Sequence, residues 1–288
     1  MNYSAMIENR KSVRAFTEQM IPYAVAQEIK QYYDTSVKRL IPELPTELHL
    51  FCMDVKAVLE GAAGYNQFLV GAPQYMVLLS EKHPLGALNA GYIMEDIILN
   101  LTDMGLDSCW VTFTDSELIK ESLGIESEKD VMAIVAFGYG IKTSKRLRLN
   151  IKSMSDIDVS IKRQFAEPKK SVNSLVFLNS WGNSKGVHEY IGFFDDMLWE
   201  SFHAVAMAPS YLNRQAYGFV IRDGQIFLVR VPDAYTPEHD EQLSLGIALL
   251  HFNAVAQNWA GSVHWNFGSA GVDLGLPEGH RVIAFWHV

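Results

Sequence analysis

The chain is poor in several features that mark whole classes of protein. It has two cysteines in 288 residues, Cys52 and Cys109, which is too few for a disulfide framework. Both stand among apolar neighbours, so we expect buried free thiols. No apolar run reaches the roughly 18 residues that a membrane-spanning helix needs. The N-terminus carries Glu8, Arg10 and Lys11 where a signal peptide would have an apolar core. We therefore expect a soluble, cytoplasmic protein with no membrane partner.

The common catalytic and metal-binding motifs are also missing. There is no Ser nucleophile elbow, no H-E-x-x-H pair and no glycine-rich phosphate loop, and the nine histidines lack metal-ligand spacing. Four isolated histidines are interpreted as core or surface residues: His83, His203, His251 and His264. The sequence thus gives little support to acid–base catalysis by the protein or to a metal centre. A bound cofactor that carries out the chemistry fits better.

Positive charge is scarce overall. The chain has 24 Lys and Arg residues against 33 Asp and Glu residues, a net charge of −9. This argues against nucleic acid as a partner, because neutralising phosphates requires a basic face. The charge is uneven, however, since nine basic and only three acidic residues lie between Lys142 and Lys170. That segment suits a local anion site in an otherwise acidic protein.

The sequence does contain one pattern twice. An offset of 155 positions superposes three pairs of identical residues: Leu88 on Leu243, Gly91 on Gly246 and Trp110 on Trp265. Each copy reads as an apolar helix, a short Trp-containing segment and then a strand-like run, at 134–137 and 282–285. We interpret the chain as a single polypeptide that imitates a homodimer.

Periodicity and turn residues predict the elements of each copy. We expect helices at 21–33, 88–104, 193–207 and 243–258, a strand at 75–79 and a hairpin at 217–231 that turns at Asp223-Gly224. The helices at 88–104 and 243–258 are apolar on most faces, so they should lie at the centre. The mixed stretch 141–180 is interpreted as the connection between the copies. These features predict an α+β fold with sheets packed around central helices, divided into halves at 1–171 and 172–288.

Each copy also has a polar part that the other lacks. The first copy opens with the basic motif Arg10-Lys11-Ser12-Val13-Arg14 and closes with the basic tail Lys145-Arg146-Leu147-Arg148. The second copy has instead the polar loop Ala208-Pro209-Ser210-Tyr211-Leu212-Asn213-Arg214-Gln215. The alternating side chains of the basic motif can face one anion, and the polar loop suits the heteroatoms of a planar cofactor. Together they suggest one composite ligand site.

Each of these segments also has an ordinary explanation. The basic motif can be a solvated stretch near a terminus, the basic tail an exposed linker, and the polar loop a turn rich in Pro, Ser and Asn. The segment Trp110-Val111-Thr112-Phe113 can present backbone N–H groups to a ring system, or it can be an edge strand with a core Trp. The complementary distribution of the segments favours the composite site.

These marks, in this order, resemble the FMN-dependent nitroreductase family. The resemblance rests on Arg10-x-Ser12-x-Arg14, Gly71-Ala72-Pro73, the run from Gly105 to Trp110, Gly138-Tyr139 before Lys145-Arg146, and Ala208-Pro209-Ser210-x-x-Asn213-x-Gln215. The chain is most similar to a subgroup of nitroreductases in which a single chain contains the duplication. In place of the family's Pro-Trp this chain has Ala216-Tyr217, and its first copy has Arg39-Leu40-Ile41-Pro42-Glu43-Leu44-Pro45 where the second has the loop.

The resemblance implies a nitroreductase-like fold with one FMN between the halves. It implies that the FMN phosphate is held by the first copy and that the flavin is partly contacted by the loop of the second copy. The implied cofactor-binding residues are Arg10, Lys11, Ser12, Arg14, Asn66, Trp110, Val111, Thr112, Lys145, Arg146, Pro209, Ser210, Asn213 and Gln215. No catalytic side chain is implied, because the chemistry takes place at flavin N5.

The implied activity is that of an FMN-dependent oxidoreductase. It would take hydride from NADH or NADPH onto the flavin and pass electrons to a nitroaromatic, a quinone or a similar planar acceptor. The alternative is a flavin-binding sensor or scavenger without turnover on the same scaffold. A single chain is expected to act as a pseudo-dimer, with a small-molecule acceptor as its partner.

Overall fold

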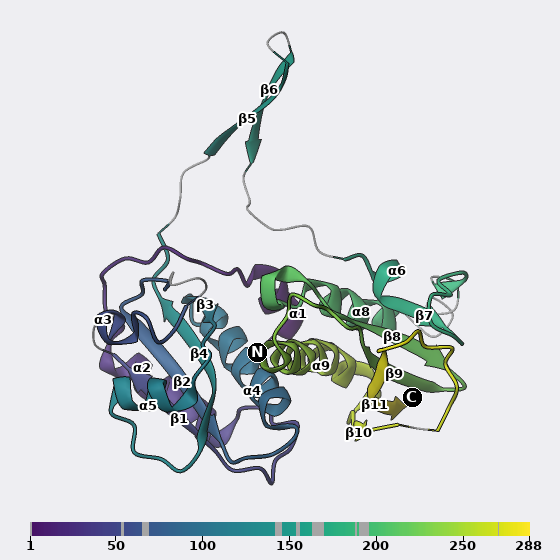
Figure 1. Ribbon diagram of the computed structural model, residues 1–288, viewed down its shortest axis with the longest axis horizontal. Helices are drawn as coiled ribbons and strands as arrows, with labels where there is room; N and C mark the ends of the chain where they lie inside the picture. Colours follow the sequence, from purple (N-terminus) through teal and green to yellow (C-terminus); the bar gives the residue numbers. More distant parts are fainter. Residues whose placement is uncertain are drawn as a thin grey trace.

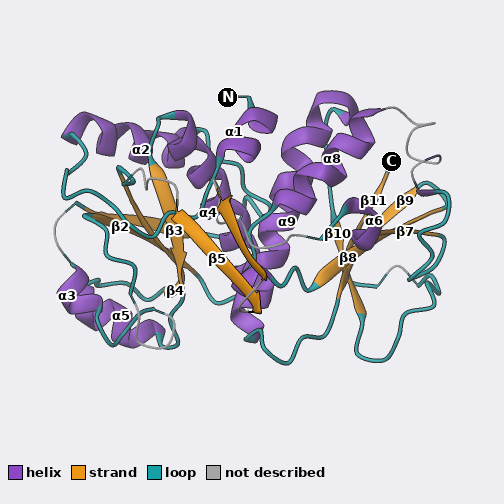
Figure 2. Cartoon of the chain, turned by 90° about the horizontal axis from the view of Figure 1, so that it is seen from above, coloured by secondary structure: helices purple, strands orange, loops and turns teal. Residues whose placement is uncertain are grey.

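Two lobes flank a central pair of helices (Figure 1). The structure is a computed structural model that describes residues 2–52, 55–64, 69–141, 146–153, 156–162, 170–187, 189, 196–269 and 271–288. Seen from above, each lobe has its own sheet, and helices α4 and α9 lie between the two sheets (Figure 2). This arrangement is the α+β fold with sheets around central helices that the sequence predicts.

The first lobe contains a four-stranded antiparallel sheet in the order β1-β2-β4-β3. Its strands are β1 Thr46–Phe51, β2 Gln74–Ser80, β3 Asp107–Val111 and β4 Asp130–Gly138. The helices around it are α1 Tyr3–Asn9, α2 Tyr23–Thr35, α3 Lys56–Leu59 and α5 Ser116–Leu123. Strand β2 is buried along its whole length, because α4 covers one face of the sheet and a second apolar cluster covers the other.

The second lobe contains a five-stranded sheet in the order β10-β11-β9-β8-β7, in which only β7 runs parallel to its neighbour. Its strands are β7 Val176–Leu178, β8 Tyr217–Arg222, β9 Gln225–Arg230, β10 Asn266–Phe267 and β11 Arg281–His287. Its helical segments are α6 Val172–Leu175, α8 Asp196–Met207 and the short η1 Tyr211–Asn213.

The two lobes share one plan. Without β7, the order β8-β9-β11-β10 of the second sheet repeats the order β1-β2-β4-β3 of the first. In both lobes a helix precedes the first strand, α2 or α8, and the central helix follows the second strand. The common plan agrees with the predicted duplication and places α4 and α9 as counterparts.

The central helices cross at two glycines. Helix α4 spans Gly86–Asp103 and α9 spans Glu238–Ala260. A Cβ on Gly91 would meet the backbone carbonyl of Leu243, and a Cβ on Gly246 would meet that of Leu88. The contact is therefore reciprocal between residues 155 positions apart, as in the self-complementary interface of a two-fold dimer. Glycine permits the close approach because it has no side chain at the crossing.

Most of the predicted elements are confirmed. Helix α2 begins after Pro22, β2 contains the strand predicted at 75–79, and the hairpin of β8 and β9 turns at Asp223 and Gly224 with positive φ angles of 50° and 72°. Helix α9 begins five residues before the predicted start, because Pro237 and an acidic first turn extend it beyond the apolar stripe. The helix predicted at 193–207 is described from Asp196 onward.

Two expectations need correction. Cys52 is exposed at the end of β1, whereas Cys109 is buried in β3, and both thiols are free. The stretch 141–180 is more than a connection, because it contains a hairpin of β5 Arg146–Ser153 and β6 Asp156–Lys162. Figure 1 shows this hairpin projecting from the two lobes. No helix in the described part of the chain is long and apolar enough to cross a membrane.

Candidate functional site

The basic motif leaves helix α1 and runs beside strand β3. Arg10 is the C-cap of α1, and the backbone N–H of Val13 donates to the carbonyl oxygen of Ser108, 2.9 Å away. This pairing fixes the segment beside β3. Lys11, Ser12 and Arg14 are exposed. The side chain of Arg10 is only 6% exposed, so it does not join the others at the surface.

Arg10 instead points to a carboxylate in the middle of α4. Nε of Arg10 lies 3.3 Å from Oε1 of Glu95, whose side chain is completely buried. Nε2 of His251, from α9, lies 3.0 Å from the same oxygen, and Nε1 of Trp110 donates to Oε2 at 3.0 Å. We call these four residues the Glu95 cluster. It joins the basic motif, β3 and both central helices.

The Glu95 cluster is charged. Burial raises the pKa of Glu95, but the positive charge of Arg10 and the contacts with His251 and Trp110 outweigh burial and bring the pKa below its ordinary value. Nδ1 of His251 lies 2.9 Å from the carbonyl oxygen of Ala204 in α8. Both ring nitrogens of His251 thus lie within hydrogen-bond distance of an oxygen, one on Glu95 and one on Ala204. The Glu95 carboxylate therefore contacts both the Arg10 guanidinium and the His251 ring.

The neighbouring carboxylate in α4 has a different task. Asp96 accepts hydrogen bonds from the hydroxyls of Tyr3 and Tyr32, at 2.7 and 2.8 Å, and from the backbone N–H of Lys38, at 2.8 Å. Burial raises the pKa of Asp96 despite these donors. The contacts tie α1, α2 and the segment after α2 to the central helix, so we interpret Asp96 as a structural residue.

The polar loop of the second lobe is held by its own side chains. Oγ of Ser210 accepts from the backbone N–H of Gln215 at 2.9 Å. Gln215 is fully buried, its Nε2 donates to the carbonyl oxygen of Ala206 at 3.0 Å, and its Oε1 accepts from the N–H of Lys170 at 2.9 Å. Pro209 is buried, and Asn213 is partly exposed with a positive φ. Gln215 thus braces the loop, while Ser210 and Asn213 lie nearer its surface.

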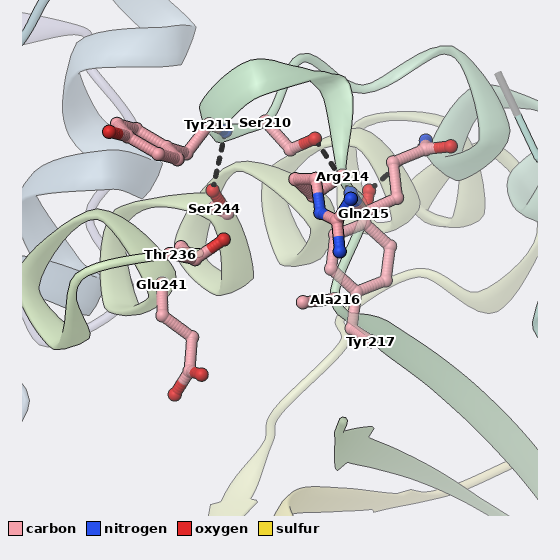
Figure 3. Close-up of a pocket in the computed structure, with 9 residues that line it drawn as sticks. All are labelled: Ser210, Tyr211, Arg214, Gln215, Ala216, Tyr217, Thr236, Glu241 and Ser244. Atoms are coloured by element: carbon pink, nitrogen blue, oxygen red, sulfur yellow. Dashed lines mark hydrogen bonds between the residues drawn. The ribbon is translucent and has the colours of Figure 1, made fainter. Parts of the chain in front are cut away.

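A small pocket lies between the polar loop and the start of α9 (Figure 3). Its lining residues are Ser210, Tyr211, Arg214, Gln215, Ala216, Tyr217, Thr236, Glu241 and Ser244. They leave no space between them even for a water-sized molecule. We therefore do not assign a cofactor to this pocket.

An ion pair joins the C-terminal end of the polar loop to the segment before α9. Arg214 donates to both carboxylate oxygens of Asp233, at 2.7 and 2.9 Å, and the hydroxyl of Thr236 donates to the same carboxylate at 2.6 Å. These donors, the Arg214 guanidinium first, lower the pKa of Asp233 to about 2. The loop is thereby fixed to the segment that leads into α9.

The depressed pKa predicts how this ion pair responds to acid. Since the folded pKa of Asp233 lies below its ordinary value of 3.8, the pair stabilises the protein at pH values above about 4, and this contribution is lost as the pH falls toward about 2. We expect urea unfolding to show Asp233→Asn less stable than the parent at pH 5 and equal to it near pH 2. The exposed Asp223, in its Asp223→Asn variant, is the control and should show a much smaller difference at pH 5. A stability gap for Asp233→Asn that stays constant with pH would contradict the prediction.

The first lobe has a different loop at the position equivalent to the polar loop. Oδ1 of Asn89 in α4 accepts from the N–H groups of Leu40 and Ile41, at 3.1 and 3.0 Å. In α9, Oγ of Ser244 accepts from the N–H of Tyr211 at 3.2 Å. Asn89 and Ser244 are 155 positions apart, so each central helix holds the loop of its own lobe at the same place. The apolar Leu40 packs against the apolar cluster that α4 shares with the second lobe.

Strand β3 leads from the basic motif toward the second lobe. Val111 is its last residue and is buried, and the carbonyl oxygen of Thr112 accepts from the N–H of Gly64 at 2.7 Å. Phe113 then meets the ring of His239 from the first turn of α9, edge to face at 5.3 Å between centroids. The segment 110–113 thus lies where the two lobes meet.

The structure brings together some of the predicted site residues. Arg10 and Trp110 share a contact with Glu95, and Ser12, Arg14, Val111 and Thr112 lie on or beside β3. Asn66 and Lys145 fall outside the described residues, and Arg146 begins β5. Within the described part of the chain, no group of three or more His, Cys, Asp or Glu residues is placed to hold a metal ion.

Sequence reasoning missed Glu95 and the part played by His251. Neither belongs to a motif, but Glu95 and Asp96 form a pair of adjacent carboxylates inside an otherwise apolar helix. Carboxylates are almost never fully buried without partners, so such a pair in a central helix signals a polar network. That signal could have been read from the sequence, although the partners could not.

Comparison with known proteins agrees with this architecture. The family model described as "Putative TM nitroreductase" matches residues 2–256. A solved structure described as a "putative nitroreductase" from Thermotoga maritima is 21% identical, with a TM-score of 0.58 over 100% of this chain and 94% of that one. An "FMN-dependent Nitroreductase" from Clostridium difficile is 18% identical, with a TM-score of 0.41 over 48% of this chain and 88% of that one. A search of curated proteins found no match.

The fold is therefore that of a nitroreductase-like oxidoreductase, with two lobes around a pair of central helices. The chain belongs to the nitroreductase family whose model spans residues 2–256.

Proposed function

We propose that the protein is an FMN-dependent oxidoreductase that takes hydride from NADH or NADPH and passes electrons to a planar acceptor such as a nitroaromatic or a quinone. Membership of the nitroreductase family supports the oxidoreductase class. When bound, FMN would supply the redox chemistry at N5 of its ring system. The tasks left to the chain are to bind the phosphate, orient the ring and exclude water.

The residues beside β3 fit the phosphate group of FMN. Lys11, Ser12 and Arg14 are exposed. Guanidinium, ammonium and hydroxyl donors on a segment fixed by a strand are suited to an anion. In this proposal they hold the phosphate together with Lys145 and Arg146 of the basic tail, while Arg10 lies behind them.

The ring system would lie toward the other end of β3. In the proposal the backbone of Trp110, Val111 and Thr112 borders it from the first half, and Ser210 and Asn213 border it from the second. Pro209 and Gln215 hold the polar loop in shape, which is consistent with the buried, fully bonded amide of Gln215. The proposal needs one chain only, and it places the boundary of the two halves near residue 171.

One observation carries the proposal. The exposed donors Lys11, Ser12 and Arg14 belong to the first lobe, and the polar loop belongs to the second. The Glu95 cluster links the elements that carry them. At the equivalent place on the first lobe, the loop after α2 packs Leu40 against the apolar cluster that α4 shares with the second lobe. This asymmetry supports one cofactor per chain.

The first test is the content and reactivity of bound flavin. We expect the purified protein to bind one FMN per chain, because only one of the two equivalent positions has the polar loop. Flavin released by denaturation and measured by absorbance gives the ratio, and two FMN per chain would contradict the composite site. Under argon, NADH or NADPH should bleach the flavin and a quinone should restore its colour. Flavin that binds but is not bleached would favour the sensor or scavenger alternative.

The second test concerns the phosphate. A hydrogen bond to a charged group contributes about 1.5–3 kcal/mol, so Arg14→Ala should weaken FMN binding by about 10- to 100-fold. Since Arg14 is exposed, the stability of the apoprotein should change little. Arg281→Ala is the control, because Arg281 is also exposed but starts β11 in the second lobe. Equal FMN affinity in the two variants, measured by quenching of flavin fluorescence, would show that Arg14 does not bind the phosphate.

A further inference from the structure

The fold alone does not require a buried charged group such as the Glu95 cluster. Burying charges is expensive, and well-packed apolar residues of similar volume often stabilise a protein as well as a buried ion pair does. The chain itself provides the comparison. Trp265, 155 positions after Trp110, donates its indole N–H to Oδ1 of Asn253 at 2.8 Å, and Asn253 donates to the hydroxyl of Tyr92 at 3.1 Å. The indole N–H of Trp265 is therefore bonded in a neutral network, whereas that of the equivalent Trp110 is bonded in a charged one.

The charged cluster occurs on the side of the proposed cofactor site. Through Arg10 it contacts the first residue of the basic motif, and through Trp110 it contacts β3. Through His251 it reaches the carbonyl oxygen of Ala204, in the last turn of the helix that leads into the polar loop. All three elements that would border the cofactor are thus tied to one carboxylate.

A second path leads from the cluster to the polar loop. Burial raises the pKa of Tyr217, and the negative charge of Glu95 raises it further, so the Tyr217 hydroxyl lies within electrostatic range of the carboxylate. Nε2 of Gln215 lies 3.4 Å from the same hydroxyl. Gln215, which braces the polar loop, therefore contacts a residue that senses the charge of Glu95.

We propose that Glu95 and His251 are positioning residues for the cofactor site: they hold the basic motif of the first half and the polar loop of the second half in one fixed geometry. This inference rests on the proposed FMN function. Glu95 attracts Arg10 from the first half and His251 from the second, so the carboxylate sets the distance between the two parts of the site.

The test compares FMN affinity with apoprotein stability in three variants. Glu95→Gln keeps an oxygen for Trp110 but removes the charge that holds Arg10 and His251. His251→Gln keeps a donor toward Glu95 and removes the donor to Ala204. Asn253→Ala is the control, because it breaks the equivalent network in the second copy and does not touch the Glu95 cluster. Flavin fluorescence quenching gives the affinity, and urea unfolding of the apoprotein gives the stability.

We expect Glu95→Gln and His251→Gln to weaken FMN binding by about tenfold or more, the effect of one lost charge-assisted hydrogen bond. Asn253→Ala should lose stability but keep its FMN affinity within about twofold of the parent. If the affinities of the two test variants fall no further than that of the control, the positioning inference is wrong while the proposed function stands. If Glu95→Gln does not fold, the FMN affinity of His251→Gln alone tests the positioning inference. If the parent protein itself does not bind FMN, the proposed function fails and the inference fails with it.

Discussion

Replacing Glu95 with glutamine is expected to lower the free energy of unfolding by about 3–5 kcal/mol, because it leaves the buried guanidinium of Arg10 without a counter-charge. Glu95 is fully buried and Arg10 is nearly so, and water therefore cannot replace the lost carboxylate. Urea unfolding of the apoprotein measures the loss. Glu18→Gln is the matched control, since Glu18 is exposed and its replacement should change stability by less than about 0.5 kcal/mol.

A double variant separates charge from packing. If the unpaired guanidinium causes much of the loss, then Glu95→Gln combined with Arg10→Met should be more stable than Glu95→Gln alone, although both residues have been changed. A loss below about 1 kcal/mol for Glu95→Gln would show that the carboxylate is not the essential partner of Arg10 and His251.

Adding one methyl group at the helix crossing is the other change with a large expected effect. In Gly91→Ala the new Cβ would overlap the backbone carbonyl of Leu243, and in Gly246→Ala it would overlap that of Leu88. A helix backbone cannot move aside as a side chain can, so α4 and α9 must separate. We expect each variant to lose about 3 kcal/mol or more. Because the two contacts are reciprocal, the two losses should be similar.

The control for this prediction lies in the same helix. Gly86 is also in α4, but a Cβ there would find its nearest atom, Cε of Met132, at an ordinary 3.5 Å. Gly86→Ala should therefore be neutral or gain up to about 1 kcal/mol from helix propensity. Thermal unfolding of all three variants makes the comparison. If Gly91→Ala and Gly246→Ala behave like Gly86→Ala, the helices do not cross as closely as the structure has them.

Much of the fold could be predicted because its signals are local. Pro22 marks the start of α2, Asp223 and Gly224 supply the positive φ angles of a tight hairpin, and the apolar surface of 88–104 requires burial. The 155-residue repeat added a long-range constraint, since equivalent helices in two copies can pack against each other symmetrically. The predicted start of α9 was wrong because its first turns are polar, and an apolar stripe cannot detect them.

The candidate site could be predicted only in part. The sequence singled out Arg10, Ser12 and Arg14 as a group, and their alternation suggested that all three face one way. The structure separates Arg10 from the others, because Glu95, 85 positions further along the chain, lies beneath it. Gln215 shows the same limit, since a polar residue in a polar loop is here fully buried. Such partners come from distant parts of the chain, and no local pattern specifies them.

The crossing of α4 and α9 also has a consequence for the growing chain on the ribosome. The two helices lie 155 positions apart, so at about 5–20 residues per second the ribosome needs roughly 8 to 30 s to deliver the second after the first. During that interval the part of the apolar surface of α4 that packs against α9 has no partner from its own polypeptide. Nascent chains on one polysome carry the same uncovered helix in close proximity. Synthesis rate and chaperone supply should therefore govern the yield of folded protein more strongly than its final stability does.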